Sequence, residues 1–220
     1  EILGGHTEVT PGMPQPICVA CAVGMVRKDR LVTSGGASPG EDLVLTKGAG
    51  IEGTAILAAD YAEALRPRLG ADGLRRARAF GQMISVVREG VRGAELGATA
   101  MHVVTEGGVL GALYELSEAS SVGFEVDADR IPVAPETAAV CDFFGLDPLR
   151  LISSGSLLIA APDGRALVQG LGAVGVDARV IGRTTAGGRL LRRGEHTEEV
   201  GPPGPDELWK AKARFGPEGR

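Results

Sequence analysis

The sequence predicts an α+β fold of the layered α/β type from Asp42 onward, and three observations support this prediction. Segments with the apolar spacing of strands alternate with segments that have the spacing of helices. Glycine supplies 34 of the 220 residues, which indicates many turns and close backbone approaches. Apolar residues make up 44% of the chain and charged residues 23%, which is enough apolar material for a sizeable core.

The bulk composition argues against several classes of protein. The formal net charge of -5 argues against nucleic acid as the main partner. The longest uncharged apolar run, ICVACAVGMV, has ten residues and is too short to cross a membrane as a helix. Three cysteines are too few for a disulfide framework, so we expect a protein of the reducing cytoplasm. Because the numbered chain starts without a methionine or a signal peptide, we expect it to be a fragment, a processed form or a trimmed form of a protein.

Two apolar strands are expected near the N-terminus, at Ile2 to Val9 and at Ile17 to Val26. The intervening TPGMPQP contains proline and glycine, which interrupt regular structure. The segment TSGGASPGE, Thr33 to Glu41, has the composition of a linker. Too little protein surrounds the two strands to cover them, so we expect them to pair with a second copy of the chain.

The part that begins at Asp42 is expected to run from a strand through a glycine loop into a helix. The strand covers Asp42 to Thr46, and the helix runs from Thr54 to Leu65. On this helix Leu57, Tyr61 and Leu65 form one buried stripe. A second helix is predicted over Leu74 to Met83.

The rest of the chain is expected to continue the alternation of helices and strands. A helix follows TEGG, Thr105 to Gly108, with Leu110, Leu113 and Leu116 on one face. The unbroken apolar run at Gly155 to Ala161 is typical of a strand buried on both faces. The other elements are expected at GFEV (strand), PETAAVCDFFG (helix), GRALVQGLGAVG (helix), ARVIGRTT (strand) and PDELWKAKAR (helix).

The glycine loop contains a G-x-G-x-x-G pattern at Gly48, Gly50 and Gly53, the spacing of a dinucleotide-binding fingerprint. That fingerprint needs a second strand about 20 residues further on, ending in an acid that holds the ribose. The counterpart region, LRPRLGADGLRRARAFG, has no β-branched run, and its Asp72 lies at a helix start. A dinucleotide site is therefore disfavoured. A tight turn without a ligand and a phosphate cradle of another family both stay open.

Three further segments carry a resemblance to a known protein family. GGHTEVTPG at Gly4 to Gly12, TEGGVLGALYELSEAS at Thr105 to Ser120 and DPLRLISSGSLLIA at Asp147 to Ala160 resemble the aminoimidazole ribonucleotide (AIR) synthase superfamily. The chain is most similar to the AIR synthase-related proteins near the branch of hydrogenase expression/formation protein E. The resemblance covers nearly the whole chain, and the order of the three motifs is more specific than any single one.

The resemblance implies a fold and a domain organisation. In that family an N-terminal α/β domain pairs with its twin into a β-barrel, a C-terminal α+β domain follows, and ATP binds between the domains. Residues 1–36 would then be the last strands of an incomplete N-terminal domain, and residues 37–220 the PurM-like C-terminal domain. The family's paired-acid metal motif would lie upstream of Glu1. A homodimer through the N-terminal strands is expected.

The resemblance also implies an activity. ATP phosphorylates an amide or acyl oxygen, and a nucleophile then displaces the phosphate, with Mg²⁺, lysine and backbone N–H groups neutralising charge. At the first glycine loop, the residues matched to phosphate binding are Lys47, Gly50, Gly53 and Thr54. In the alternative interpretation Lys47 is a solvated strand end and the glycines form only a turn.

The second glycine-rich helix start offers four more candidates for nucleotide binding, Thr105, Glu106, Gly107 and Gly108. Alternatively Thr105 is a plain N-cap and Glu106 complements the helix dipole. Relatives often have an acid two residues before this threonine, where Val103 stands. A valine binds no metal and moves no proton, which puts direct catalysis at this loop in doubt.

His6 and Glu8 are the candidate Mg²⁺ ligands, because alternate residues share one face of a strand. Relatives have an acid at the position of His6, and imidazole is a poorer ligand for this hard ion. A structural histidine is the alternative interpretation.

The cysteines are expected to be buried and unreactive. Cys18 and Cys21 form a C-x-x-C pattern, but on a strand they point to opposite faces, which disfavours a shared metal. Cys141 lies on the apolar side of a predicted helix. The hydrogenase branch uses a C-terminal thiol, and the numbered chain has no cysteine after Cys141.

Two functions therefore remain in view. The first is an ATP-dependent enzyme that acts on a small amide or acyl group. The second is a non-catalytic homologue that keeps the fold, the dimer and nucleotide binding for a regulatory purpose.

Overall fold

The computed structural model describes residues 2–12 and 15–216, which fall into two units, Glu1–Arg30 and Leu31–Arg220. The described residues of the first unit form no strand and only one 3-10 turn, η1 (Lys28–Arg30), and their side chains are exposed. The predicted strands Ile2 to Val9 and Ile17 to Val26 are therefore wrong for this chain by itself. A strand needs a neighbour for its N–H and C=O groups, and no described segment provides one. The predicted domain boundary at Gly36/Ala37 stays a prediction.

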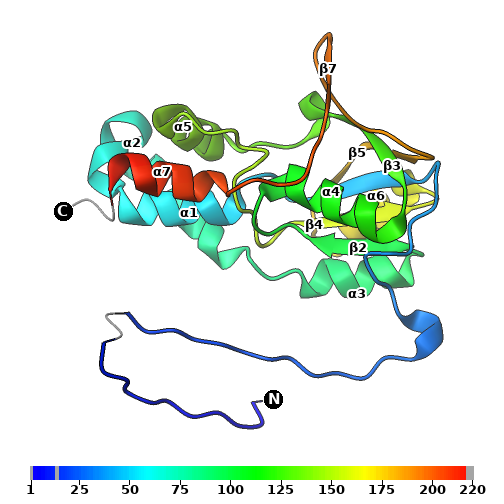
Figure 1. Ribbon diagram of the computed structural model, residues 1–220, viewed down its shortest axis with the longest axis horizontal. Helices are drawn as coiled ribbons and strands as arrows, with labels where there is room; N and C mark the ends of the chain where they lie inside the picture. The colour runs from blue at the N-terminus through cyan, green and yellow to red at the C-terminus, as the bar shows by residue number, and fades with distance from the viewer. Residues whose placement is uncertain (1, 13–14, 217–220) are drawn as a thin grey trace. The chain divides into compact units, whose positions relative to one another are not determined.

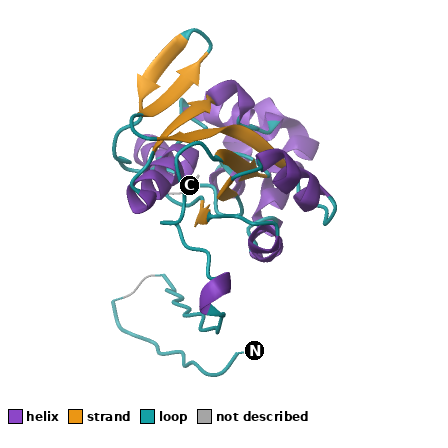
Figure 2. Ribbon diagram, turned by 90° about the vertical axis from the view of Figure 1, so that its right-hand side faces the viewer, coloured by secondary structure: helices purple, strands orange, loops and turns teal. Residues whose placement is uncertain are grey.

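The second unit is built on a mixed sheet of seven strands in the order β2-β4-β1-β5-β3-β6-β7 (Figures 1 and 2). All neighbouring strands are antiparallel except β3 and β6, which are parallel. The strands that the structure describes are β1 (Asp42–Thr46), β2 (Ala100–Val103), β3 (Gly123–Asp127), β4 (Leu157–Ala161), β5 (Ala178–Thr185), β6 (Arg189–Arg193) and β7 (His196–Glu199).

Seven α-helices accompany the sheet in the described part of the chain (Figure 1). They are α1 (Ile51–Asp60), α2 (Ala62–Ala79), α3 (Val87–Glu95), α4 (Gly108–Ser120), α5 (Pro135–Phe144), α6 (Gly164–Gly172) and α7 (Glu207–Phe215). Two further 3-10 turns, η2 (Phe80–Gln82) and η3 (Ala128–Arg130), follow α2 and β3. None of the helices in residues 2–12 and 15–216 has the length and apolar character that crossing a membrane requires.

The centre of the sheet is covered on both faces. Leu43 and Leu45 of β1 pack in one apolar cluster with the leucines of α4, whereas Val44 packs in another with Leu167 and Leu171 of α6. Alternate side chains of a strand point to opposite faces, so β1 and its neighbour β4 are buried on both. This burial explains the unbroken apolar run predicted as a strand.

A second apolar cluster joins the helices α1, α2, α5 and α7 (Figure 1) and includes Leu151 of the loop before β4. Tyr61 and Phe144 meet edge to face with ring centroids 5.2 Å apart, and Leu208 of α7 belongs to the same cluster. The C-terminal helix is therefore part of the core of this unit.

Several predicted boundaries are wrong for local reasons. The helix predicted over Thr54 to Leu65 is divided at Tyr61, which has non-helical backbone angles between α1 and α2. The helix predicted over Leu74 to Met83 ends at Ala79 and starts well before Leu74, with a non-helical residue at Gly70. The sequence interpretation also missed α3, β2, β6 and β7. On α3 the apolar Val87 and Val91 are exposed. This helix therefore lacks the usual pattern, in which apolar residues lie on the face toward the core.

Candidate functional site

Three loops meet at one edge of the sheet, and together they form the candidate site. They follow β1, follow β2 and precede β4. Because β1 and β2 are both antiparallel to β4, their C-terminal ends lie beside the N-terminal end of β4. The Val104 N–H donates to the carbonyl of Ser156 at 3.0 Å, and the Leu110 N–H donates to the carbonyl of Leu149 at 3.1 Å. These hydrogen bonds bring the segments around Thr105–Gly108 and Ser153–Leu158 together.

The loop after β1 is held by two buried serines. Ser153 and Ser156 donate their hydroxyl hydrogens to the carbonyl of Gly48 at 3.1 and 2.5 Å. The Ile51 N–H donates to Ser153 Oγ at 3.1 Å, and the Gly53 N–H donates to the carbonyl of Ile152 at 2.9 Å. At least two N–H groups in the first turn of α1 are therefore bound within the protein.

The glycines of this loop allow close packing. Gly50 has a left-handed φ of 68°, which favours glycine. A Cβ on Gly53 would lie 2.5 Å from two side-chain atoms of Leu151. Thr54 is buried and donates its hydroxyl hydrogen to Thr137 Oγ1 at 2.9 Å. Phosphate binding by Gly50, Gly53 and Thr54 stays a prediction, and it would require these contacts to open.

Lys47, the last residue before the glycine loop, points into the protein. Its Nζ donates to the carbonyls of Met83, Ser85 and Gly155 at 3.0, 2.8 and 2.6 Å. It also forms an ion pair with Glu89, with 2.5 Å between Nζ and Oε1. The Lys47 side chain is 15% exposed and that of Glu89 2% exposed. The interpretation of Lys47 as a solvated strand end is therefore wrong.

The loop after β2 brings the start of α4 against the chain's C-terminal part. Gly107 is the N-cap of α4, without a side-chain cap, so the interpretation of Thr105 as the capping residue is wrong. The Gly107 N–H donates to Asp206 Oδ2 at 2.7 Å. A Cβ on Gly108 would lie 2.6 Å from the carbonyl oxygen of Leu149. Glu106 is exposed and Thr105 is half-buried, so both are open to a ligand.

Two cavities flank these loops. A cavity of about 200 Å³ beside Gly107 is lined by Arg150, Pro203, Gly204, Pro205, Glu207 and Lys210. A larger cavity of about 580 Å³ lies beside Gly48. Its apolar lining includes Phe80, Met83 and Ile131, and its charged lining includes Asp129, Asp177 and Arg179. The smaller cavity combines the cationic side chains of Arg150 and Lys210 with a glycine-rich helix start, and these side chains form ion pairs with Asp147 and Glu207.

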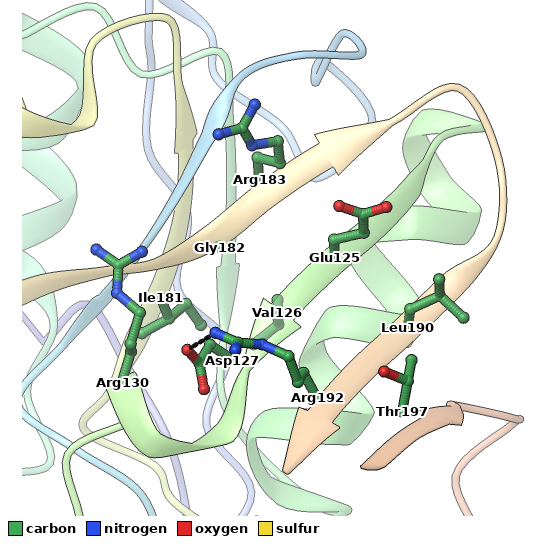
Figure 3. Close-up of a pocket in the computed structure, with 10 residues that line it drawn as sticks. All are labelled: Glu125, Val126, Asp127, Arg130, Ile181, Gly182, Arg183, Leu190, Arg192 and Thr197. Carbon is green, nitrogen blue, oxygen red and sulfur yellow. Dashed lines mark hydrogen bonds and ion pairs between the residues drawn. The ribbon is translucent and has the colours of Figure 1, made fainter. Parts of the chain in front are cut away.

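A third cavity of about 310 Å³ lies on the face of β3, β5 and β6 (Figure 3). Its lining includes the charged side chains of Glu125, Asp127, Arg130, Arg183 and Arg192. Arg192 forms an ion pair with Asp127, and the labelled side chains project from the strand face and the turn after β3 (Figure 3). The three guanidinium groups exceed the two carboxylates by one charge, and none of the sequence candidates lies among the lining residues. The site is therefore assigned to the loops at the sheet edge.

The metal candidates lie outside this unit. His6 and Glu8 are exposed in the first unit, and their Mg²⁺ binding stays a prediction. Within residues 2–12 and 15–216, no three His, Cys, Asp or Glu side chains are grouped as a metal site would require. Cys18 and Cys21 are exposed, so the prediction of buried cysteines is wrong for this pair; Cys141 is buried as predicted. No described segment covers the apolar run around Cys18 and Cys21.

Sequence reasoning missed the residues that hold the site together. Asp206 follows Gly107 by 99 positions, and Glu89 follows Lys47 by 42 positions. The signal at Asp206 was visible, since PDEL has an N-cap acid before a helix. No local pattern indicated Glu89, because a glutamate on a short helix normally faces solvent.

Most of the chain is similar to known proteins. The family model described as "AIR synthase related protein, C-terminal domain" matches residues 38–193. The carbamoyl dehydratase HypE of Rhizobium leguminosarum bv. viciae is 30% identical over 191 residues, which are 84% of this chain and 53% of that protein.

Solved structures show the same fold. E. coli HypE aligns with a TM-score of 0.65 and 24% identity over 82% of this chain and 55% of that one. A hydrogenase maturation protein HypE in complex with ATP aligns with a TM-score of 0.62 and 21% identity, over 84% and 57% of the two chains. The predicted PurM-like C-terminal fold is thereby confirmed. The chain spans about half the length of these relatives.

Proposed function

Because the chain belongs to the AIR synthase related family, whose C-terminal domain matches residues 38–193, we propose that it binds ATP and phosphorylates a small amide or acyl oxygen. The full protein would perform this reaction, and residues 37–220 would form one wall of the nucleotide site. Two relatives support the proposal. The protein of Rhizobium leguminosarum is a carbamoyl dehydratase, and another HypE has been solved in complex with ATP.

The observation that carries the proposal is the convergence of the three loops at one edge of the sheet. Two of these loops contain the sequence segments that carry the family resemblance, and they are joined through Val104 and Ser156. Phosphoryl transfer needs positioning and charge neutralisation more than covalent chemistry. A rigid group of loops that includes a helix start and lies near cationic side chains suits that need.

The roles of individual residues follow from their exposure. Thr105 and Glu106, at the open start of α4, would contact the nucleotide or its acceptor. Arg150 and Lys210, which line the adjacent cavity, would neutralise phosphate charge. Gly107 and Gly108 would bring the backbone close to the ligand. The first glycine loop would hold the three converging loops in place through the contacts described above, which involve Lys47, Gly50, Gly53 and Thr54.

Mg²⁺ would balance the charge of ATP and polarise its terminal phosphate. Glu8 offers a suitable carboxylate, but the imidazole of His6 suits this ion poorly. The described residues do not form a complete Mg²⁺ site, so we assign no step to the ion.

The proposed assembly is a homodimer through the N-terminal segments. Ile2, Val19 and Met25 are 95%, 89% and 103% exposed, and such apolar side chains favour a covering partner. Pairing in the dimer would supply the neighbours that the two predicted strands need. Light scattering is the test, and a clean monomer near 22.6 kDa would contradict this part of the proposal.

The second candidate function is a non-catalytic homologue that binds the nucleotide without turning it over. Val103 favours it, because this side chain at the end of β2 is 37% exposed where relatives often have an acid. The fold and the three converging loops would then serve binding or regulation.

Calorimetry with Mg-ATP on the chain together with its natural upstream sequence separates the two functions. The enzyme is expected to release binding heat and to form ADP when a carbamoylated or amide acceptor is added. Thr105→Ala and Arg150→Ala should weaken binding about tenfold each, in line with the loss of one hydrogen bond to a charged group. Arg179→Ala, in the larger cavity, is the matched control. Binding without ADP favours the second function, and the absence of binding contradicts both.

A further inference from the structure

The ammonium group of Lys47 lies inside a cage of four oxygen atoms. Three are the backbone carbonyl oxygens of Met83, Ser85 and Gly155, at 3.0, 2.8 and 2.6 Å from Nζ. The fourth is Oε1 of Glu89, at 2.5 Å. These five residues come from the end of β1, the segment from η2 into α3, and the loop before β4. We call the four oxygens the Lys47 cage.

The chemistry of the cage is that of a cation site rather than of a simple ion pair. A lysine ammonium has three N–H donors, and three carbonyls already accept from them. Glu89 Oε1 has no hydrogen-bond partner of good geometry, although it lies 2.5 Å from Nζ. The carboxylate therefore contributes charge rather than a directed hydrogen bond. Several carbonyl oxygens with one carboxylate form the ligand set that proteins use for hard cations.

The backbone of Lys47 indicates that the side chain is retained for its charge. Its φ is 55°, and among residues 2–12 and 15–216 only Ser121 is another non-glycine residue with positive φ. This conformation costs free energy for every residue with a Cβ, and glycine adopts it most easily. A lysine at this position therefore carries a backbone cost that a glycine would avoid.

The cage also cannot stay empty without a cost. Glu89 is 2% exposed, and a buried carboxylate without a counter-charge is strongly destabilising. The three carbonyl dipoles point at the same position and repel one another unless a positive charge lies between them. Gly155 and Met83 are packed closely, since a Cβ on Gly155 would lie 2.6 Å from the carbonyl oxygen of Met83.

We propose that the Lys47 cage is a monovalent-cation site that the chain fills with its own ammonium group. Lys47 is thereby a positioning residue of the candidate site, since the cage holds Gly155 in the loop whose Ser153 and Ser156 bind Gly48. This inference does not depend on ATP binding, because the cage lies within residues 37–220 and its occupancy affects folding stability directly.

The test replaces the tethered cation by a free one. Lys47→Gly removes the ammonium and relieves the backbone strain at the same time. In choline chloride, whose cation is too large for the cage, its Tm should fall by about 10 °C, the loss expected when a buried charge loses its partner. Ammonium or potassium chloride at the same ionic strength should restore at least half of that loss. The unchanged protein should melt at the same temperature in all three salts.

Three control variants separate charge from packing and strain. Lys47→Met fills the space with an apolar stem, so it should lose stability and gain nothing from ammonium. The double variant Lys47→Gly with Glu89→Gln should lose the rescue, since a neutral cage attracts cations weakly. Ser121→Gly relieves the other positive φ without opening a cage and should show no salt dependence.

Two results would overturn the proposal. One is a Lys47→Gly protein with the same reduced Tm in choline, potassium and ammonium chloride. The other is a Lys47→Gly protein as stable in choline as the unchanged chain. If the variant cannot be recovered folded from choline, refolding yield replaces Tm. Equal yields in choline and ammonium, including zero in both, then count against the cation site.

Discussion

Asp206 Oδ2 accepts the backbone N–H of Gly107 at 2.7 Å, and this contact joins the start of α7 to the start of α4. The second oxygen, Oδ1, accepts the N–H of Leu208 at 2.8 Å, so one buried carboxylate caps two helices. The negative charge lies at the positive ends of both helix dipoles. The C-terminal helix is therefore coupled to the loop that carries Thr105 and Glu106.

We predict that Asp206→Ala lowers the free energy of unfolding by about 2 kcal/mol, since it removes two caps and leaves two N–H groups without a partner. Urea denaturation followed by the fluorescence of Trp209, the only tryptophan of the chain, measures this loss. Asp163→Ala is the matched control, because Asp163 caps only α6 through Ala166. It should cost about 1 kcal/mol. Equal losses in the two variants would argue against the double cap.

The packing function of Gly53 predicts a coupling with Leu151. A Cβ on Gly53 would lie 2.5 Å from Leu151, whose side chain is fully buried. Gly53→Ala should therefore cost about 1–3 kcal/mol by overpacking. In a Leu151→Ala background the same change should cost less than about 1 kcal/mol, because space has been made.

Gly90→Ala is the control for helix propensity, since a Cβ on Gly90 meets nothing within 4 Å. It should be neutral or slightly stabilising. If Gly53→Ala left stability unchanged but abolished nucleotide binding, the result would contradict the packing function of this glycine and favour phosphate binding.

Arg76 and Glu136 predict a pH dependence of stability. The guanidinium of Arg76 donates to the nearly buried carboxylate at 2.5 Å and lowers the pKa of Glu136 below its ordinary value of 4.5. A carboxyl whose pKa is lower in the folded state stabilises the protein above its unfolded pKa, and this contribution is lost as the pH falls below about 4.5. Denaturation midpoints measured from pH 6 to pH 3 should show the loss.

Arg76→Ala should flatten that part of the profile, and Arg75→Ala should leave it unchanged. Arg75 is the neighbouring arginine, and its carboxylate partner, Asp72, is exposed. An identical acid profile for the unchanged protein and Arg76→Ala would contradict the assignment.

The three cysteines should differ sharply in reactivity. Burial raises the pKa of the Cys141 thiol to about 12, whereas Cys18 and Cys21 are exposed. The thiolate is the reactive form, so at pH 8 iodoacetamide should modify Cys18 and Cys21 within minutes and leave Cys141 intact until the protein unfolds. Mass spectrometry of tryptic peptides measures the three rates, with fragmentation to separate Cys18 from Cys21, which share one peptide.

The same shift predicts an alkaline limit to stability. Above pH 9.0, the ordinary value for this thiol, unfolded chains lose the Cys141 proton while folded ones keep it up to about pH 12. Stability should therefore decline as the pH rises above 9, and Cys141→Val should weaken this decline. Fast modification of Cys141 in the folded protein at pH 8 would contradict both statements.

Local patterns determined much of the fold. Pro135 lies at the first turn of α5 and Gly145 at its left-handed end, as local chemistry requires. The unbroken apolar run of β4 predicted a strand covered on both faces. The leucine spacing after Gly108 announced α4. In each case the pattern that predicts the element, a helix cap or a spacing of apolar residues, lies within about ten residues of sequence.

The tertiary structure alone decided what the glycine loops and Lys47 do. A G-x-G-x-x-G pattern has the same letters whether its N–H groups face a phosphate or, as here, Ser153 Oγ and the Ile152 carbonyl. Glu89 and Asp206 reach their partners across the fold, and no periodicity along the chain records such contacts. The strands expected at Ile2 to Val9 and at Ile17 to Val26 failed for the same reason. The sequence determines which segments can pair. A strand, a cap between two helices or the Lys47 cage forms only when the tertiary structure brings hydrogen-bonding or charged groups from distant parts of the chain together.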